Sequence, residues 1–270
     1  MAGTQVVELV AHGPGGVAPM TDTVAVEEPL EIRVNGEPFA VAMRTPGDDE
    51  ALAIGFLFGE SVIESEASVE TVASWPGDPA LGNRVNVVLA PEASAAFAER
   101  ATRRRHVAVT SACGLCGRLT MDGLSRDGMP LPFAWTVESS LVASLPERLR
   151  EVQAGFAETG GLHAAGLFAR DGTMVTVAED VGRHNAVDKV VGRMVRQKRL
   201  PLSDHLLAVS GRASFEIVQK ALAAGIPLVA AVSAPSSLAI RCADAGGLTL
   251  AGFVRNQQFN VYSHPGRIGF

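Results

Sequence analysis

The chain has 270 residues, of which 47% are hydrophobic and 19% are charged, and it carries a net charge of -6. This composition excludes a disordered or coiled-coil chain, and the length predicts one or two domains that bury a core without disulfides. The acidic balance argues against general nucleic-acid binding, because the chain has no excess of positive charge to meet phosphate backbones.

The sequence contains no pattern typical of a targeting or membrane segment. The first 20 residues lack a basic start followed by an apolar run, so residues 1–20 are expected to form a flexible tail. The longest uncharged stretch, residues 221–240, contains glycine and prolines and therefore predicts a helix end, a buried strand and a turn. With only three cysteines, the chain is expected in the reducing cytoplasm, without membrane contact.

Residues 21–110 predict a small α+β domain. Asn35-Gly36 favours a tight turn that joins strands at 30–34 and 39–44 into a hairpin. Apolar residues at helical spacing follow Asp48 and Asp49 and predict a helix that ends near Gly59. The remaining predicted elements are strands at 69–74, 85–89 and 106–110 and a helix at 92–104.

Residues 111–132 predict a mobile loop that contains Cys113 and Cys116. Two thiols three positions apart can come within disulfide range or present one exposed thiolate, which is the nucleophilic form. The spacing is compatible with metal binding, redox chemistry or sulfur transfer. Structural zinc is disfavoured, because it needs about four ligands and the only other cysteine is Cys242.

Residues 133–270 predict an α/β domain in which strands alternate with helices. Predicted helices lie at 137–156, 186–195, 217–222 and 236–243, and predicted strands at 162–169, 174–177, 206–209, 226–232, 248–254 and 259–262. The alternation favours a mostly parallel sheet between two helical layers, opened by a hairpin at Asp171-Gly172. The element order is that of cytidine deaminases, but His163 is followed by two alanines where a deaminase needs His-X-Glu.

Three polar segments follow predicted strands, and ligands bind at such strand ends in open α/β sheets. Two of the segments open helices, where free N–H groups favour an anion, and the third offers an aromatic ring and amides for a heterocycle. Each segment also has an ordinary interpretation as a helix cap or a polar turn. The candidate binding residues are Gly182, Arg183, His184, Ser210, Gly211, Arg212, Phe253, Val254, Arg255, Asn256, Gln257 and Gln258.

The residues between the predicted strand at 174–177 and the predicted helix at 186–195 suggest further roles. Glu179 and Asp180 are candidate acceptors for a base or a sugar hydroxyl, and Arg183 is suited to a phosphate. Asn185 is a candidate helix cap.

Taken together, the SACGLCG loop, EDVGRHNAVDKVVG, SGRASFEIVQKALAAGIPLVAAVSAPSSLAI and NVYSHPGRI resemble the formate dehydrogenase accessory sulfurtransferase family, FdhD. The resemblance covers residues 24–268. It implies a cytoplasmic, dimeric sulfur carrier that receives sulfur from a cysteine desulfurase as a cysteine persulfide. The sulfur then passes to the molybdenum (or tungsten) cofactor, in its bis-guanine-dinucleotide form, before that cofactor enters formate dehydrogenase. A cytidine-deaminase-like C-terminal domain is also implied.

Carried onto this chain, the resemblance makes Cys113 the persulfide cysteine and Cys116 the second cysteine of the loop. Residues 253–258 match the cofactor-binding stretch, and GDP is an expected mimic of the nucleotide end of the substrate. The turns at Gly182 and Ser210 are our own assignments as nucleotide cradles. Two alternatives remain open at this point: a cofactor-binding chaperone without covalent sulfur transfer, and a thiol-disulfide oxidoreductase.

Overall fold

The computed structural model describes residues 3–14, 16–74, 83–103, 130–132 and 134–269. Cys113, Cys116 and the predicted strand at 106–110 lie outside the described residues, as does most of the predicted loop at 111–132.

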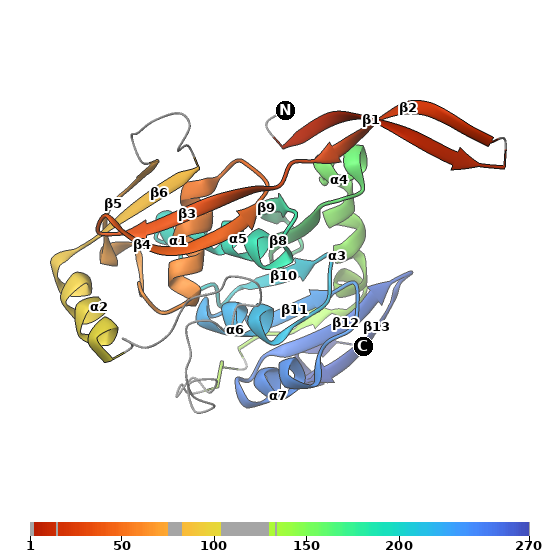
Figure 1. Ribbon diagram of the computed structural model, residues 1–270. Coiled ribbons are helices and arrows are strands. Elements are labelled where there is room, and N and C mark those ends of the chain that lie inside the picture. Colours follow the sequence, from red (N-terminus) through yellow and green to blue (C-terminus); the bar gives the residue numbers. More distant parts are fainter. Residues whose placement is uncertain (1–2, 15, 75–82, 104–129, 133, 270) are drawn as a thin grey trace.

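The chain forms a mixed α/β fold with several sheets (Figure 1). The strands are β1 (Thr4–Gly13), β2 (Gly16–Ala25), β3 (Glu28–Val34), β4 (Glu37–Arg44), β5 (Val69–Ser74), β6 (Arg84–Leu89), β7 (Val137–Glu138), β8 (His163–Ala169), β9 (Met174–Asp180), β10 (His205–Val209), β11 (Leu228–Ala231), β12 (Thr249–Arg255), β13 (Gln258–Ser263) and β14 (Ile268–Gly269). The α-helices are α1 (Asp49–Gly59), α2 (Pro91–Arg103), α3 (Ser139–Glu151), α4 (Ala154–Thr159), α5 (Arg183–Arg196), α6 (Phe215–Ala223) and α7 (Ser237–Ala245). No helix among these is long and apolar enough to cross a membrane.

A six-stranded sheet with the order β13-β12-β11-β10-β8-β9 forms the centre of the C-terminal part. Only the β10–β11 and β11–β12 pairs are parallel, whereas β8–β9, β8–β10 and β12–β13 are antiparallel. The expectation of a mostly parallel sheet is therefore wrong, and the sheet is mixed. Tight turns after Ala169 and Arg255 join neighbouring strands directly, and a direct hairpin makes its strands antiparallel.

Helices cover both faces of this sheet. On one face, α3 packs Val142, Leu145 and Leu149 into a core with Phe168 of β8. On the other face lie α5, α6 and α7, whose buried side chains belong to a larger core (Figure 1). The three layers place the ends of several strands at one open edge.

The segment predicted as a separate α+β domain shares this larger core. Its four-stranded sheet has the order β4-β3-β6-β5, and its helix α1 crosses α5 at very close range. A Cβ added to Gly55 would lie 1.9 Å from the carbonyl oxygen of Asp188, and one added to Gly192 would lie 1.9 Å from that of Ala51. Only glycines at both positions allow this backbone-to-backbone contact, which joins the two parts of the chain.

The N-terminal residues form an element that the sequence did not predict. Residues 4–13 and 16–25 pair as an antiparallel hairpin, β1–β2, which extends away from the body past α4 (Figure 1). This corrects the expected tail at residues 1–20. Period-2 alternation is weak here because apolar side chains lie on both faces, and Val6 and Val10 remain 67% and 68% exposed.

A groove at the strand ends

All three polar segments predicted from the sequence lie at the same edge of the six-stranded sheet. β9, β10, β11 and β12 end there, and β8 begins there, because it runs antiparallel to β9 and β10. The register places His163 opposite Asp180 and Val209 opposite Ala165. The sheet topology thus brings together segments that lie up to about 75 positions apart in the sequence.

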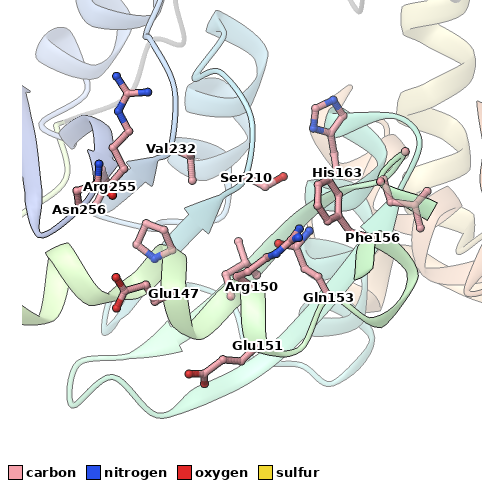
Figure 2. A pocket seen from close by; sticks show the side chains of 16 residues that line it. Glu147, Arg150, Glu151, Gln153, Phe156, His163, Ser210, Val232, Arg255 and Asn256 are labelled. Atoms are coloured by element: carbon pink, nitrogen blue, oxygen red, sulfur yellow. The ribbon is translucent and has the colours of Figure 1, made fainter. Parts of the chain in front are cut away.

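A groove with a volume of about 770 Å³ opens at this edge, and we call it the strand-end groove. The C-terminal half of α3, the α3–α4 connection, α4 and the start of β8 form one side (Figure 2). The ends of β10, β11 and β12 provide the floor and the other side. Its lining residues include Arg150, Gln153, Phe156, His163, Ser210, Val254, Arg255 and Asn256.

One wall of the groove depends on a helix break that the sequence pattern concealed. The apolar spacing predicted one helix over residues 137–156, but α3 ends at Glu151 and α4 begins at Ala154. The carboxylate of Glu179 accepts hydrogen bonds from the backbone N–H groups of Gly155 (2.9 Å) and Phe156 (2.8 Å). Glu179 is therefore a capping residue for α4, and both of its oxygens are used in the fold rather than offered to a ligand.

The cations Arg183 and Arg212 lie close to the end of the groove near the β10 turn, although neither lines the groove. His163 lines it, and the burial of that ring together with the nearby charges of Arg183 and Arg212 lowers the pKa of His163 below its ordinary value. A Cβ on Gly211 would lie 3.4 Å from Nδ1 of His163 and 3.7 Å from Cδ of Arg183. The Nε of Arg183 is buried without a hydrogen-bond partner among the described residues. An anion at this end would meet these donors.

The turns after β10 and β11 are held rigidly by backbone contacts. Ser210 donates its backbone N–H to Ala164 (3.0 Å), and its hydroxyl accepts from the N–H of Ala164 (2.8 Å). Ala213 and Pro235 form a parallel bridge between the two turns. The groove floor beneath Ser210 is therefore preformed.

Gly182 and His184 lie close to this edge but serve the fold. Gly182 is the N-cap residue of α5, and its N–H donates to Oδ1 of Asp180 at 2.8 Å. His184 links the starts of two helices, with Nδ1 2.9 Å from Glu216 and Nε2 2.9 Å from Ser214. Neither residue lines the strand-end groove.

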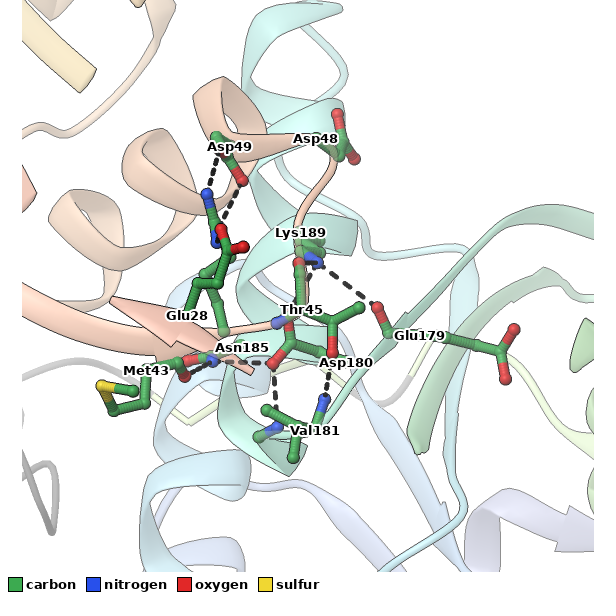
Figure 3. A network of polar contacts seen from close by, with 12 residues as sticks. Glu28, Met43, Thr45, Asp48, Asp49, Glu179, Asp180, Val181, Asn185 and Lys189 are labelled. Atoms are coloured by element: carbon green, nitrogen blue, oxygen red, sulfur yellow. Dashed lines mark hydrogen bonds and ion pairs between the residues drawn. The ribbon is translucent and has the colours of Figure 1, made fainter. Parts of the chain in front are cut away.

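Asp180 is the centre of a buried polar network rather than a ligand acceptor (Figure 3). Its carboxylate lies 2.7 Å from Nζ of Lys189 and accepts from Nδ2 of Asn185 and the N–H of Thr45. Asn185 also donates to the carbonyl of Met43, so it bridges to β4 and does not cap α5. These contacts anchor the N-terminal part to the strand end.

The C-terminal candidate segment divides at a β-bulge. The ladder between β12 and β13 shifts between Gly252 and Arg255, and Phe253 takes a φ of 54°, which is unusual for an aromatic residue. Val254, Arg255 and Asn256 line the groove, whereas Phe253 and Gln258 do not. Gln257 reaches the rim, where its Nε2 lies 3.3 Å from Glu147 of α3.

Sequence reasoning missed several residues of the groove. Arg150, Gln153 and Phe156 were concealed within a predicted continuous helix, because the apolar spacing continues across the break between α3 and α4. His163 was considered only as a deaminase ligand. Among the described residues, no cluster of three His, Cys, Asp or Glu side chains is arranged to hold a metal ion.

Comparison with known proteins is consistent along nearly the whole chain. Residues 25–269 match the FdhD/NarQ family. A relative named sulfur carrier protein FdhD, from Streptomyces coelicolor, is 51% identical over 259 residues, which cover 94% of this chain and 92% of the relative. A relative of the same name from Mycobacterium tuberculosis is 48% identical over 257 residues, covering 92% of both chains.

A similar structure is also known. The crystal structure of a proposed formate dehydrogenase accessory protein from Desulfotalea psychrophila superposes with a TM-score of 0.78. It is 25% identical in sequence and covers 99% of this chain and 100% of that one.

Proposed function

The chain belongs to the FdhD/NarQ family, and we propose that it is a sulfur carrier that supports formate dehydrogenase. In this proposal it is a sulfurtransferase that takes persulfide sulfur from a cysteine desulfurase and delivers it to a molybdenum cofactor bearing guanine dinucleotides. The observation that supports it most is that Ser210, Val254, Arg255 and Asn256, expected to bind the cofactor, line one preformed groove.

Cys113 is proposed to carry the sulfur. Its thiolate attacks the outer sulfur of the desulfurase persulfide, the donor's S–S bond breaks, and the desulfurase cysteine leaves as a thiolate. Cys116 then has one of two roles. In the first route it accepts that outer sulfur. In the second route it attacks Cys113, forms a disulfide with it and expels the outer sulfur as sulfide. The second route requires a thiol reductant to return both cysteines to thiols.

The strand-end groove is proposed to hold the cofactor as a substrate. The end of the groove at His163, close to the cations Arg183 and Arg212, suits the phosphates of a guanine dinucleotide. The apolar side chains of Leu149, Phe156 and Val254 suit a flat heterocycle. We further propose a cytidine-deaminase-like arrangement for the C-terminal part and a homodimer as the working form, as the family resemblance implies.

The sulfur step is tested by mass spectrometry. Reduced protein is incubated with a cysteine desulfurase and cysteine, as wild type, Cys113→Ala and Cys116→Ala. We expect a gain of one sulfur atom on the Cys113 peptide that disappears in Cys113→Ala. If both variants lose the added sulfur equally and a disulfide is the only product in the wild type, the result favours a thiol-disulfide oxidoreductase.

If no variant and no wild-type protein gains sulfur from an active desulfurase, the proposed sulfur transfer is contradicted. Protection by GDP against thermal unfolding then decides what remains, because a ligand that binds only the native state raises the apparent stability. Protection without sulfur loading leaves a cofactor-binding chaperone.

A further inference from the structure

We propose that Gln153 selects the heterocycle bound in the strand-end groove, by donating a hydrogen bond from its side-chain amide to a ring carbonyl. The inference rests on the proposed nucleotide-bearing substrate and names the residue that reads its base.

The side chain of Gln153 is buried but incompletely satisfied. Its exposed fraction is 4%, and its Nε2 has no hydrogen-bond partner among the described residues. Gln153 also lines the strand-end groove. Because buried amide donors in folded proteins are nearly always paired, an orphaned donor on a groove wall points to a partner that arrives with the ligand.

The backbone around Gln153 is held in place before any ligand binds. Its N–H donates to the carbonyl of Arg150 at 3.2 Å, and its carbonyl accepts from the N–H of Ala157 at 2.9 Å. Glu179 holds the next turn through Gly155 and Phe156. The backbone that carries the amide is thus preorganised at the helix break, which reduces the ordering cost of binding.

The surroundings of Gln153 suit a flat ring with polar edges. The guanidinium of Arg150 stacks on the ring of Phe156, with Cζ 3.8 Å from the ring centroid. Figure 2 shows Gln153 beside these two side chains, on the opposite side of the groove from Arg255 and Asn256. A planar heterocycle that enters here meets apolar and aromatic surface on its face and an amide donor at its edge.

A donor at this position favours one class of base. Guanine and pterin share a ring carbonyl beside a ring N–H, whereas adenine carries an amino group at the corresponding position. An amide N–H pairs with a carbonyl acceptor but opposes an amino donor. With the phosphates at His163 and Arg183, the ring of a guanine nucleotide would lie toward Gln153, and adenine would pair with the amide only if the amide turned its Oε1 toward the ring.

The test measures nucleotide affinities of the full-length protein by calorimetry, using GDP, IDP and ADP as probes. IDP keeps the ring carbonyl of GDP but lacks its amino group. In the wild type we expect GDP and IDP to bind about tenfold more tightly than ADP, the effect of one hydrogen bond. In Gln153→Met, GDP and IDP lose that advantage and ADP affinity is unchanged.

A matched control and a stability measurement separate base reading from a structural role. Gln197→Met replaces an exposed glutamine at the end of α5 and should leave all three affinities unchanged. Gln153→Met removes an orphaned donor, so the melting temperature without ligand should stay equal or rise. A clear fall in that temperature would mean that the fold already satisfies the amide, and it would overturn the inference.

The remaining outcomes distinguish the inference from the proposed function. If the wild type prefers GDP and Gln153→Met keeps the same preference, Gln153 is not the reader, while nucleotide binding stands. If no nucleotide binds the wild type, base selection fails together with the nucleotide part of the proposed function. The sulfur-loading experiment on Cys113 is independent of both results.

Discussion

Two neighbouring regions of the molecule differ in whether their buried polar groups are paired. At the junction between α1, α5 and α6, the chain pairs its own charges: Lys189 with Asp180 at 2.7 Å, and Lys220 with Asp188 at 2.6 Å. In the neighbouring strand-end groove, Nε2 of Gln153 is buried without a partner among the described residues, and so is Nε of Arg183 beside the groove.

This difference separates residues that maintain the fold from residues available to a ligand. A buried charge costs several kcal/mol unless it is paired, so the junction is stable only with all its partners present. The groove tolerates incomplete pairing because a ligand can complete it. Asp180 and Arg183 lie three positions apart, yet they fall on opposite sides of this division.

The largest expected effect comes from breaking the junction at Lys189. Lys189→Met leaves the fully buried Asp180 without its cation and should lower the free energy of unfolding by about 3–5 kcal/mol. Urea denaturation measures the change. As a control, Lys198→Met removes an exposed partner of Glu66 and should change stability by less than about 0.5 kcal/mol. Equal effects of the two variants would contradict the junction's role.

The second junction pair gives a pH-dependent effect. Burial raises the pKa of Asp188, and the charge of Lys220 opposes that rise. In Lys220→Met the opposition is lost, so the folded state binds a proton more readily than the unfolded state. The variant should therefore be strongly destabilised at pH 7, by about 3 kcal/mol, and should regain stability as the pH falls through the raised pKa of Asp188.

A double variant checks the cause of that loss. Asp188→Leu combined with Lys220→Met removes both charges and should recover much of the stability lost in the single variant. Urea titrations at pH 7 and pH 5 measure all the variants. If the loss of stability in Lys220→Met does not change with pH, and the losses of the two substitutions add in the double variant, the result would count against charge pairing.

In the groove, a substitution should change binding and leave the fold intact. Arg183→Met removes a donor group beside Gly211 and His163, so GDP affinity should fall about 10- to 100-fold. The melting temperature without ligand should stay close to that of the wild type. Arg241→Met, at an exposed position on α7, is the matched control for both measurements. A loss of stability as large as that of Lys189→Met would mean that Arg183 maintains the fold, as Lys189 does, and is not available to a ligand.

The smallest effect concerns His163. Its pKa lies below 6.5 in the folded state, mainly because of burial and then because of Arg183. Below pH 6.5 the unfolded chain therefore takes up the proton first, and stability falls as the pH drops toward the lowered pKa. His163→Gln should reduce that slope.

His205 complicates the wild-type slope, because burial lowers its pKa too. The informative quantity is the difference in slope between wild type and His163→Gln, measured by thermal unfolding between pH 5 and pH 8. Phosphate in the buffer should also reduce the wild-type slope if an anion binds beside His163. An unchanged slope in the variant would mean that the pKa of His163 is not lowered in the folded state.

Local sequence signals predicted most elements well. The strands at 69–74 and 206–209 and the helices near 186–195 and 217–222 were found within a few residues of β5, β10, α5 and α6. Their hydrophobic periodicity and their glycine or asparagine boundaries are local properties that can be read along the chain. The polar segments after β9, β10 and β12 were found for the same reason.

Non-local contacts account for the failures. The α3–α4 break depends on Glu179, which lies more than 20 positions from Gly155 and Phe156, and no local pattern indicates it. The mostly parallel sheet was predicted wrongly because periodicity identifies strands but not their neighbours or relative directions. The hairpin at residues 4–25 was missed because it carries apolar side chains on both faces.

The sequence by itself determined the element types, the family and the residues expected to carry sulfur, because these follow from local patterns and from motifs in order. Only the tertiary structure decided which polar residues are used in the fold and which remain available. Asp180, Glu179 and His184 looked like ligand residues but are satisfied by Lys189, α4 and the start of α6. Gln153 looked like an ordinary helix residue and emerged as an unpaired donor, because pairing depends on contacts between distant segments.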